Sequence, residues 1–301
     1  FFQAEDGIRD AQESRGLGDV YKRQILDSVV KDLVASSPFI NLEFIEAGEI
    51  LNESNVEKLF DYYKIDSGVV SFNLNRDFVD YRITPFFSTE QISELNINNF
   101  DLDSLSYFQV SEFLNHHSFS SIKIEKSDIA VYLQLPDNYD SYLKSLSKKN
   151  RHELKRKKRI FEDKFDDFSY EQSKDEIIFD EFITLHRNST GEKGDYMTEE
   201  IEKFYKALFE EDKWAIHYLK HKDSMIAGAF VYESEKVEYL YNSCRDHNLD
   251  EFNTGTYLND QLLQNSIKKS KQYFDFLKGE EKYKFNFGGE VHQLYDLKIK
   301  V

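Results

Sequence analysis

Apolar residues in the second half of the chain follow helix and strand spacings closely enough to predict most of its elements. Helical spacing predicts helices at 139–165, 177–187 and 199–210, the last with Thr198 as its N-cap. Runs rich in aromatic and β-branched residues predict strands at 129–135, 167–171, 214–219, 225–232, 237–243, 273–277 and 297–301. A glycine turn at 253–256 opens a further helix, so strand, turn, helix and strand form a βαβ unit between 239 and 277.

The pattern before residue 127 is weaker. It predicts helices at 29–35, 56–63 and 102–114 and a strand at 68–73. Residues 1–24 have no apolar periodicity and no initiating Met, and they resemble a conceptual translation of sequencing-adapter DNA. We exclude them from the fold and expect the natural N-terminus to be missing. The remaining chain is divided into a first domain at 25–126 and a second at 127–301, which contains the basic helix 139–165.

Two short segments carry the candidate chemistry. At 274–287, two aromatic-rich strand patterns flank a connection with one Gly and several ionisable side chains, as at a reactive strand end. The turn at 253–256 leaves free backbone N–H groups at a helix start, and no acidic side chain lies between Asn253 and Asn259. Such a terminus favours an anion. Because only Gly255 is a glycine there, a plain structural turn is the alternative.

Charge separates one segment from the rest of the molecule. The formal net charge is −17, which disfavours general binding to nucleic acid or anionic membrane. Between 144 and 159 a single acid, Glu153, stands among nine basic residues, namely Lys144, Lys148, Lys149, Arg151, Lys155, Arg156, Lys157, Lys158 and Arg159. This segment is either a solvated face or a collar for an anionic ligand, and RNA is a third option.

A single cysteine, Cys244, argues against a disulfide framework, and no His/Cys spacing indicates a metal site. We expect Cys244 to be a small buried side chain. No apolar run approaches the ~18 residues of a membrane helix, so we expect a cytoplasmic protein.

Five motifs in order resemble the CelD-type branch of the GNAT acyltransferases, which is named for a link to cellulose biosynthesis. They are Tyr142–Arg151, Leu154–Lys157, Met225–Gly228, Asn253–Leu258 and Asp275–Lys284. The resemblance extends from about Ser127 to Leu297. It implies an α+β GNAT fold with a mixed central sheet flanked by helices, in two tandem GNAT-like lobes of which the first is degenerate and truncated.

The resemblance also implies roles for individual residues. An acyl-CoA co-substrate would contact Tyr241, Asn242, Asn253, Thr254, Gly255, Thr256 and Tyr257. Tyr283 is the matching phenol for protonating the thiolate, with packing among Phe285 and Phe287 as the alternative. Glu281, directly or through water, and His186 are the candidate bases. The substrate contacts are Arg151, Arg187, Asp275 and Lys284, and we expect Lys284 to pair with Glu281 or Asp275 or to meet an anionic acceptor.

The resemblance therefore predicts an acyl-CoA-dependent N-acyltransferase acting on an amine of a sugar, amino acid or peptide in envelope or exopolysaccharide metabolism. A FemAB-like transferase that uses aminoacyl-tRNA, or a non-catalytic accessory of polysaccharide synthesis, are the alternatives. The usual pyrophosphate loop of the family has several glycines or small residues, whereas here Gly255 stands alone, so coenzyme A binding is the first expectation to test.

Overall fold

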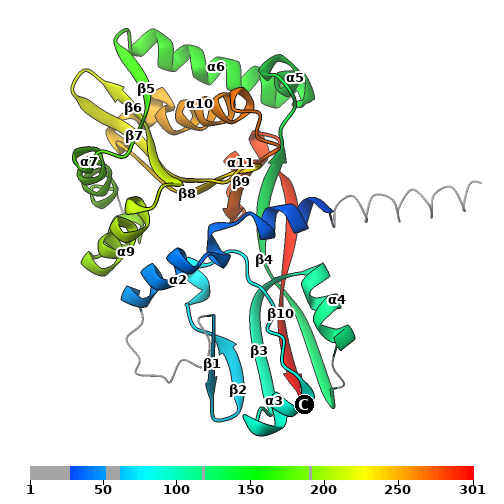
Figure 1. The fold of residues 1–301 in the computed structure, drawn as a ribbon. Coiled ribbons are helices and arrows are strands. Elements are labelled where there is room, and N and C mark those ends of the chain that lie inside the picture. The colour runs from blue at the N-terminus through cyan, green and yellow to red at the C-terminus, as the bar shows by residue number, and fades with distance from the viewer. Residues whose placement is uncertain (1–27, 52–61, 117–118, 190–191) are drawn as a thin grey trace, which may run out of the picture.

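The computed structural model describes residues 28–51, 62–116, 119–189 and 192–301. One ten-stranded sheet runs through them (Figure 1). The strands are β1 (Tyr63–Asp66), β2 (Val69–Phe72), β3 (Asn99–Ser106), β4 (Ser121–Gln134), β5 (Phe168–Ser173), β6 (Trp214–His221), β7 (Ser224–Glu233), β8 (Val237–Arg245), β9 (Tyr273–Lys278) and β10 (Glu290–Lys300). Their spatial order is β1-β2-β3-β10-β4-β9-β8-β7-β6-β5.

Helices flank this sheet. Residues 28–35 are helical, and short 3₁₀ helices include η3 (Arg76–Phe78) and η4 (His247–Phe252). The α-helices are α2 (Leu42–Gly48), α3 (Thr89–Glu94), α4 (Tyr107–His116), α5 (Tyr139–Ser145), α6 (Lys148–Lys164), α7 (Glu176–Arg187), α8 (Glu192–Asp195), α9 (Glu199–Glu210), α10 (Thr254–Lys268) and α11 (Lys282–Asn286). None of these described helices is both long and apolar enough to cross a membrane.

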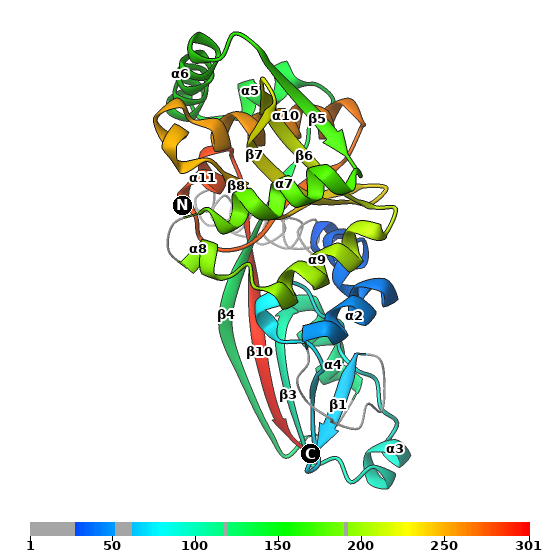
Figure 2. The same cartoon turned by 90° about the vertical axis from the view of Figure 1, so that its left-hand side faces the viewer.

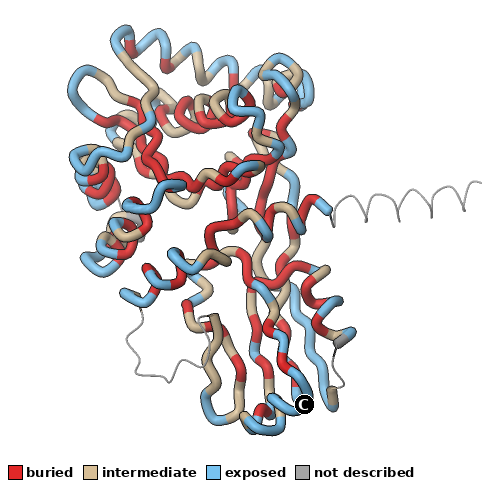
Figure 3. The backbone as a smooth tube through the Cα atoms, viewed as in Figure 1, coloured by how far each residue is buried: buried red, intermediate tan, exposed pale blue. Residues whose placement is uncertain are grey.

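The helices divide between the two faces of the sheet where it is formed by β5 to β9. α6 and α10 cover one face, and α7 and α9 cover the other (Figure 2). On the first face Phe161 of α6 and Leu262 of α10 pack against sheet residues such as Phe274. On the second face Phe182 and Phe204 pack with Phe230. Figure 3 shows the buried residues concentrated where these layers meet.

The sheet has an upper part, which contains β5 to β9, and a lower part, which contains β1 to β3. The two parts share the long strands β4 and β10. β4 and β10 pair with each other along almost their whole length, from Tyr132 and Glu290 at one end to Ser121 and Lys300 at the other. In the upper part β4 pairs with β9, and in the lower part β10 pairs with β3. The two parts are therefore joined by continuous backbone hydrogen bonding rather than by a linker.

The parallel pair β8 and β9 separates at the centre of the upper sheet. Their pairing ends at Tyr239 opposite Asp275, although β8 continues to Arg245 and β9 to Lys278. Leu277 has a left-handed backbone (φ +61°), and its N–H donates to Asp275 Oδ1 at 2.8 Å. Because β8 stays with β7 and β9 stays with β4, the two strands diverge and leave an opening between them.

Most predicted elements of the second half are confirmed. The helix predicted at 199–210 is α9, with Thr198 as its cap, and the helix predicted at 177–187 is α7. The predicted strands correspond to β4 through β9, although β4 begins at Ser121 and not at 129, and the C-terminal strand is β10. In the first half, the helix at 29–35 and the strand at 68–73 are also confirmed. Residues 1–24 and most of the helix predicted at 56–63 lie outside the described residues, and the last residue of that helix, Tyr63, instead begins β1.

Three predicted elements are wrong in part. The helix predicted at 102–114 begins only at Tyr107, because the preceding residues form β3 between β2 and β10. The basic helix 139–165 is broken into α5 and α6 at Leu146 and Ser147, where Ser147 Oγ accepts from Asn150 N–H and so starts a new helix. The second aromatic pattern of 274–287 is the helix α11 rather than a strand.

Candidate active site

A cavity of about 960 Å³ opens where β8 and β9 diverge. Its walls come from the ends of these two strands, the start of α10, the beginning of α11 and the segment Arg76–Asp80 of the lower part. Distant regions of the chain therefore form a single site. Of the residues expected to act in the reaction, the cavity brings together Tyr241, Asn242, Asn253, Thr254, Gly255, Thr256, Glu281, Tyr283 and Lys284.

The start of α10 supplies the polar end of the cavity. Asn253 is left-handed (φ 60°), and the N–H of Tyr257 is the first to donate within the helix, to Asn253 O at 3.0 Å. The N–H groups of Thr254, Gly255 and Thr256 come before this bond and therefore have no acceptor within the helix. Thr254 is fully buried, and its Oγ1 has no hydrogen-bond partner in the described part of the chain. A helix start with a buried, unpartnered hydroxyl is suited to an anionic ligand.

The side chains around this helix start include one arginine that is paired with an aspartate. No acidic residue occurs in the first turn of α10. Arg245 lies so close that a Cβ on Gly255 would be 3.3 Å from its Cδ. The Arg245 guanidinium pairs with Asp250 at 2.6 Å, which fixes it beside the helix. Gly255 thus lets a ligand approach the backbone N–H groups closely, which a larger residue would restrict.

Tyr283 presents a phenol to the same cavity from α11. Its ring packs edge-on against Phe276, with 6.0 Å between ring centroids. Burial, together with the nearby charge of Glu281, raises the pKa of the Tyr283 phenol above its usual value. The hydroxyl is therefore protonated at neutral pH and is able to donate a proton.

Lys284 and Glu281 have different positions although they form an ion pair of 3.0 Å. Lys284 is buried, and its Nζ donates to the backbone carbonyls of Leu277, Lys278 and Gly279. It therefore stabilises the end of β9. The Glu281 side chain is 56% exposed and lies at the rim of the cavity.

Asp80 is a cavity residue that the sequence pattern did not indicate. Its carboxylate accepts a hydrogen bond from the backbone N–H of Lys278, at the end of β9. Burial raises the pKa of Asp80 above its usual value, while the charges of Lys278 and Lys284 oppose that shift. Tyr241 on β8 holds the same segment by donating its phenol hydrogen to Phe78 O at 3.1 Å. No motif surrounds Asp80, because its position depends on the packing of the lower part against β8 and β9.

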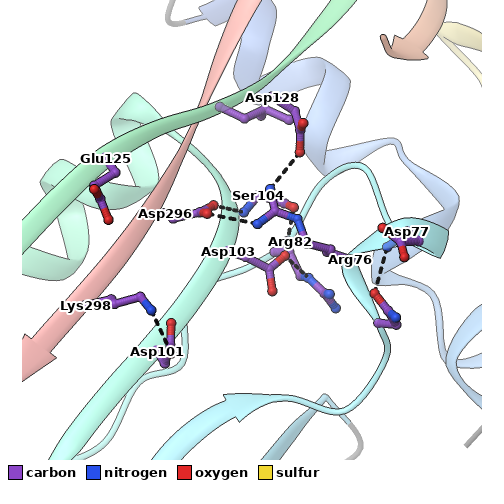
Figure 4. A network of polar contacts seen from close by, with 12 residues as sticks. Arg76, Asp77, Arg82, Asp101, Asp103, Ser104, Glu125, Asp128, Asp296 and Lys298 are labelled. Atoms are coloured by element: carbon purple, nitrogen blue, oxygen red, sulfur yellow. Dashed lines mark hydrogen bonds and ion pairs between the residues drawn. The ribbon is translucent and has the colours of Figure 1, made fainter.

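Ion pairs join the cavity floor to the shared strands. Arg76 bridges Asp128 and Asp296 at 2.7 and 2.9 Å (Figure 4). Lys278 donates to Val79 O at 2.9 Å and to Ser104 Oγ at 2.8 Å. The lower part therefore holds both Asp80 and the end of β9 in place.

Five predicted site residues do not line the cavity. His186 is fully buried behind it, with Nε2 3.2 Å from Asn242 Oδ1, and Asn242 in turn donates to Tyr205 Oη at 2.6 Å. Tyr257 is stacked on Phe161, with 3.9 Å between ring centroids. His186 therefore reaches the cavity through residues that line it, Asn242 and Tyr196, and Tyr257 supports the start of α10 from behind.

The other three are occupied by structural contacts. Arg151 donates to Leu143 O at 3.2 Å across the break between α5 and α6. Arg187 forms an ion pair with Glu202 at 2.6 Å. Asp275 is fully buried on β9 and accepts from Tyr81. These contacts join elements of the fold to one another.

Cys244 is buried, with Sγ 3.7 Å from Phe182 O, as expected for a small packed side chain. In the described residues no group of three or more His, Cys, Asp and Glu side chains is arranged to hold a metal ion.

Comparison with solved structures gives the fold of the chain. A conserved protein of unknown function from Bacteroides thetaiotaomicron has a TM-score of 0.58 at 12% identity, over 87% of this chain and 92% of that one. The C-terminal (DUF2156) domain of a putative lysylphosphatidylglycerol synthetase from Agrobacterium fabrum has a TM-score of 0.52 at 11% identity, over 86% of this chain and 92% of that one. At such low identity these two likenesses show the fold alone.

Comparison with family models finds a similarity in the central segment. None of the curated proteins matches the chain. Residues 148–285 match the family described as "Acetyltransferase (GNAT) domain", a range that contains β5 to β9, α10 and Tyr283. Residues 148–285 are therefore similar to a GNAT acetyltransferase domain.

Proposed function

We propose that this protein is an acyl-CoA-dependent N-acyltransferase that transfers an acetyl or larger acyl group to an amine of a sugar, amino acid or peptide. The observation that carries the proposal is the opening between β8 and β9, which leads directly to the start of α10 with its buried, unpartnered Thr254 hydroxyl. A thioester donor with a long arm and a pyrophosphate matches this arrangement at both ends. The arm would lie between the strands, and the pyrophosphate would meet the helix start.

The donor arm would bond to backbone groups that the sheet leaves unpaired. Beyond Tyr239 and Asp275, the facing edges of β8 and β9 have no ladder bonds to each other. Amide groups of an extended arm can pair with such edges as an added strand does. At the phosphate end, Arg245 and the Thr254 hydroxyl would add to the backbone N–H groups of Gly255 and Thr256.

Transfer needs a neutral amine and an acid for the departing sulfur. Asp80 would remove one proton from the acceptor ammonium. The amine nitrogen then attacks the thioester carbonyl, the C–N bond forms and the C–S bond breaks. Tyr283 gives its proton to the thiolate, and the proton that the amide nitrogen loses restores the phenol. One proton in total is released from Asp80 to solvent.

The other candidate bases occupy less direct positions. Glu281 lies at the rim and pairs with Lys284, so it would act through water. His186 is buried behind Asn242, so its proposed role is to orient that amide. Asp80 is the candidate that combines exposure to the cavity with burial from bulk solvent.

The charge of the cavity wall favours an amine acceptor. Four acids line it on the side of the lower part and of α11, namely Asp77, Asp80, Asp128 and Glu281, and they outnumber the three cations there, Arg76, Lys278 and Lys284. Carboxylates attract a protonated amine before it reacts. An exopolysaccharide or envelope acceptor, as the CelD-like resemblance implies, is the proposed substrate class.

The lower part of the molecule resembles the upper part in one respect. Each part contains one parallel strand pair, β2 with β3 and β8 with β9, in a sheet that is otherwise antiparallel. This supports the proposal of two tandem lobes, with a boundary near residue 126. β4 and β10 contribute to both.

A second candidate function is favoured by α6. Its basic side chains include the exposed Lys148, Lys149, Lys155, Arg156 and Arg159. The helix packs antiparallel to α10, since Phe161 stacks on Tyr257 and Lys158 pairs with Asp260, so its C-terminal end lies near the start of α10. A basic face beside the donor site fits an aminoacyl-tRNA donor as an alternative to acyl-CoA.

The test is thiol release from acetyl-CoA in the presence of glucosamine, glycinamide or a lysine-containing peptide. Thiol release that depends on the amine supports the proposal, and a mass increase of the amine by one acetyl group identifies the bond formed. Acyl transfer from aminoacyl-tRNA but not from acyl-CoA would instead support the second function. No transfer from either donor by folded protein would contradict both.

A further inference from the structure

The lower half of β4 is an open edge of the sheet. β10 pairs with β4 from Ser121 to Tyr132, whereas β9 pairs with it only from Ala130 onward. Within the described residues, the other side of Ser121–Ser127 therefore has no neighbouring strand. In Figure 1 this half of β4 runs down the outside of the lower part beside β10. Such an edge presents a row of unpaired N–H and C=O groups.

An apolar row reaches this edge and continues into solvent. Ile299 and Leu297 of β10 are buried beneath α4, together with Phe113. Their direct cross-strand partners on β4 are Ile122 and Ile124, which share the same face of the sheet. These two isoleucines are 48% and 46% exposed. The apolar layer thus extends past the helix that covers it, and Figure 3 shows the exposed strand.

The opposite face of the same edge carries alternating charge. Lys123 and Glu125 lie there, 2.9 Å apart. The same face carries Lys298, Asp101 and Asp296, which Figure 4 shows together with Glu125. Both side chains are at least half exposed. One strand edge therefore combines an apolar face and a face with a positive and a negative group two residues apart.

We propose that this edge pairs with the same edge of a second copy of the chain, antiparallel about a two-fold axis at Ile124. In this register Ile124 faces Ile124, and Lys123 of each copy lies opposite Glu125 of the other. Opposite charges directly across a strand pair are stabilising, whereas like charges are destabilising. The two sheets would join into one, with Ile124 of each copy against Ile124 of the other.

Neighbouring registers lack this complementarity. A shift by one position centres the axis on Lys123 and places it opposite itself, and a shift the other way does the same to Glu125. Charge therefore selects the register at Ile124. A symmetric interface of this kind is isologous and closes with two copies, so the assembly is a dimer rather than a fibre.

The experiment is analytical ultracentrifugation of the full chain over a wide range of concentration. The wild type should sediment as a dimer at high concentration. Lys123→Glu and Glu125→Lys should each weaken the dimer about tenfold, because two attractive pairs become repulsive in each case. The double variant Lys123→Glu with Glu125→Lys should restore it. Lys126→Glu on the same strand is the matched control, because Lys126 lies opposite Ile122 and its reversal creates no like-charge pair.

Thermal unfolding of each variant separates loss of the dimer from loss of the fold. A wild type that remains a monomer at every concentration would overturn the proposal. A dimer that both single reversals leave unchanged, or that the double reversal fails to restore, would overturn it as well, since the interface would then lie elsewhere or in another register.

Discussion

Tyr81 donates its phenol hydrogen to Asp275 Oδ2 at 2.6 Å, and both side chains are fully buried. Tyr81 follows Asp80 in the lower part, and Asp275 lies on β9 in the upper part. The other oxygen of Asp275 accepts the N–H of Leu277 at 2.8 Å, where the backbone is left-handed. One buried carboxyl group therefore joins the segment that carries Asp80 to the turn at which β9 leaves β8.

Removing that phenol should destabilise the protein. Tyr81→Phe leaves a buried carboxyl oxygen without its donor, which costs about 1–3 kcal/mol of unfolding free energy. Tyr132→Phe is the control, since its hydroxyl makes a longer bond of 3.3 Å to the exposed Glu290. Urea unfolding measures the free energy of unfolding that each of the two substitutions removes. Equal effects of the two substitutions would contradict the role given to the Tyr81 bond.

The Asp275 carboxyl should also make stability depend on pH. Burial raises its pKa to about 7, from 3.8 in the unfolded chain. Because the folded state then binds the proton more tightly than the unfolded state, the free energy of unfolding falls as pH rises from about 4 to about 7. The slope from this one group is at most ~1.4 kcal/mol per pH unit. Asp275→Asn removes this contribution. The difference in unfolding free energy between the wild type and this variant should therefore shrink or reverse as pH rises. A difference that stays constant from pH 4 to 7 would contradict the raised pKa.

Asp80→Asn should lower the rate of acyl transfer by ~10²–10⁴, the usual contribution of a positioned base. The wild-type rate should rise with pH through a pKa above the ordinary aspartate value, and the variant should lose that rise. Asp77→Asn is the matched control, because Asp77 also lines the cavity but lies exposed in the first turn of η3. The loss should be smaller for an acceptor whose amine is already neutral at the assay pH. If the two variants behave alike, Asp80 is not the base.

Tyr283→Phe should slow turnover while leaving acyl-CoA affinity nearly unchanged, because the phenol acts on the departing sulfur and not on the bound donor. Tyr107→Phe, on an exposed tyrosine of α4, should change neither quantity. Steady-state rates and calorimetric donor binding separate the two effects. Parallel loss of rate and affinity in the Tyr283 variant would indicate that the hydroxyl supports the fold of the site instead.

The sequence predicted the elements whose own pattern determines them. α9 places Ile201, Phe204, Tyr205 and Leu208 at helical spacing behind a Thr198 cap, and its bounds were predicted fully. β3 was missed because Asn99–Ser106 becomes a strand only by pairing with β2 and β10, which are distant in the chain. The break before α6 was missed because Leu143, Leu146 and Leu154 continue a helical spacing across Ser147.

The same distinction applies to the candidate site. The α10 start, Tyr283 and the pairing of Lys284 with Glu281 follow from neighbouring residues, and the structure places them around one cavity or its rim. Asp80 reaches that cavity only because the lower part packs against β9, so no local pattern could indicate it. His186, Arg187, Arg151, Asp275 and Tyr257 carry polar or aromatic groups that the fold uses in contacts outside the cavity.

The most direct test of the account is calorimetric binding of acetyl-CoA to the wild type and to Gly255→Glu. We expect saturable binding to the wild type and a loss of at least about tenfold in affinity in the variant, because the new carboxylate would lie against the proposed phosphate site. Ile177→Glu, which adds the same charge to the exposed first turn of α7, should bind like the wild type. A folded wild type that binds neither acetyl-CoA nor coenzyme A would contradict the central claim.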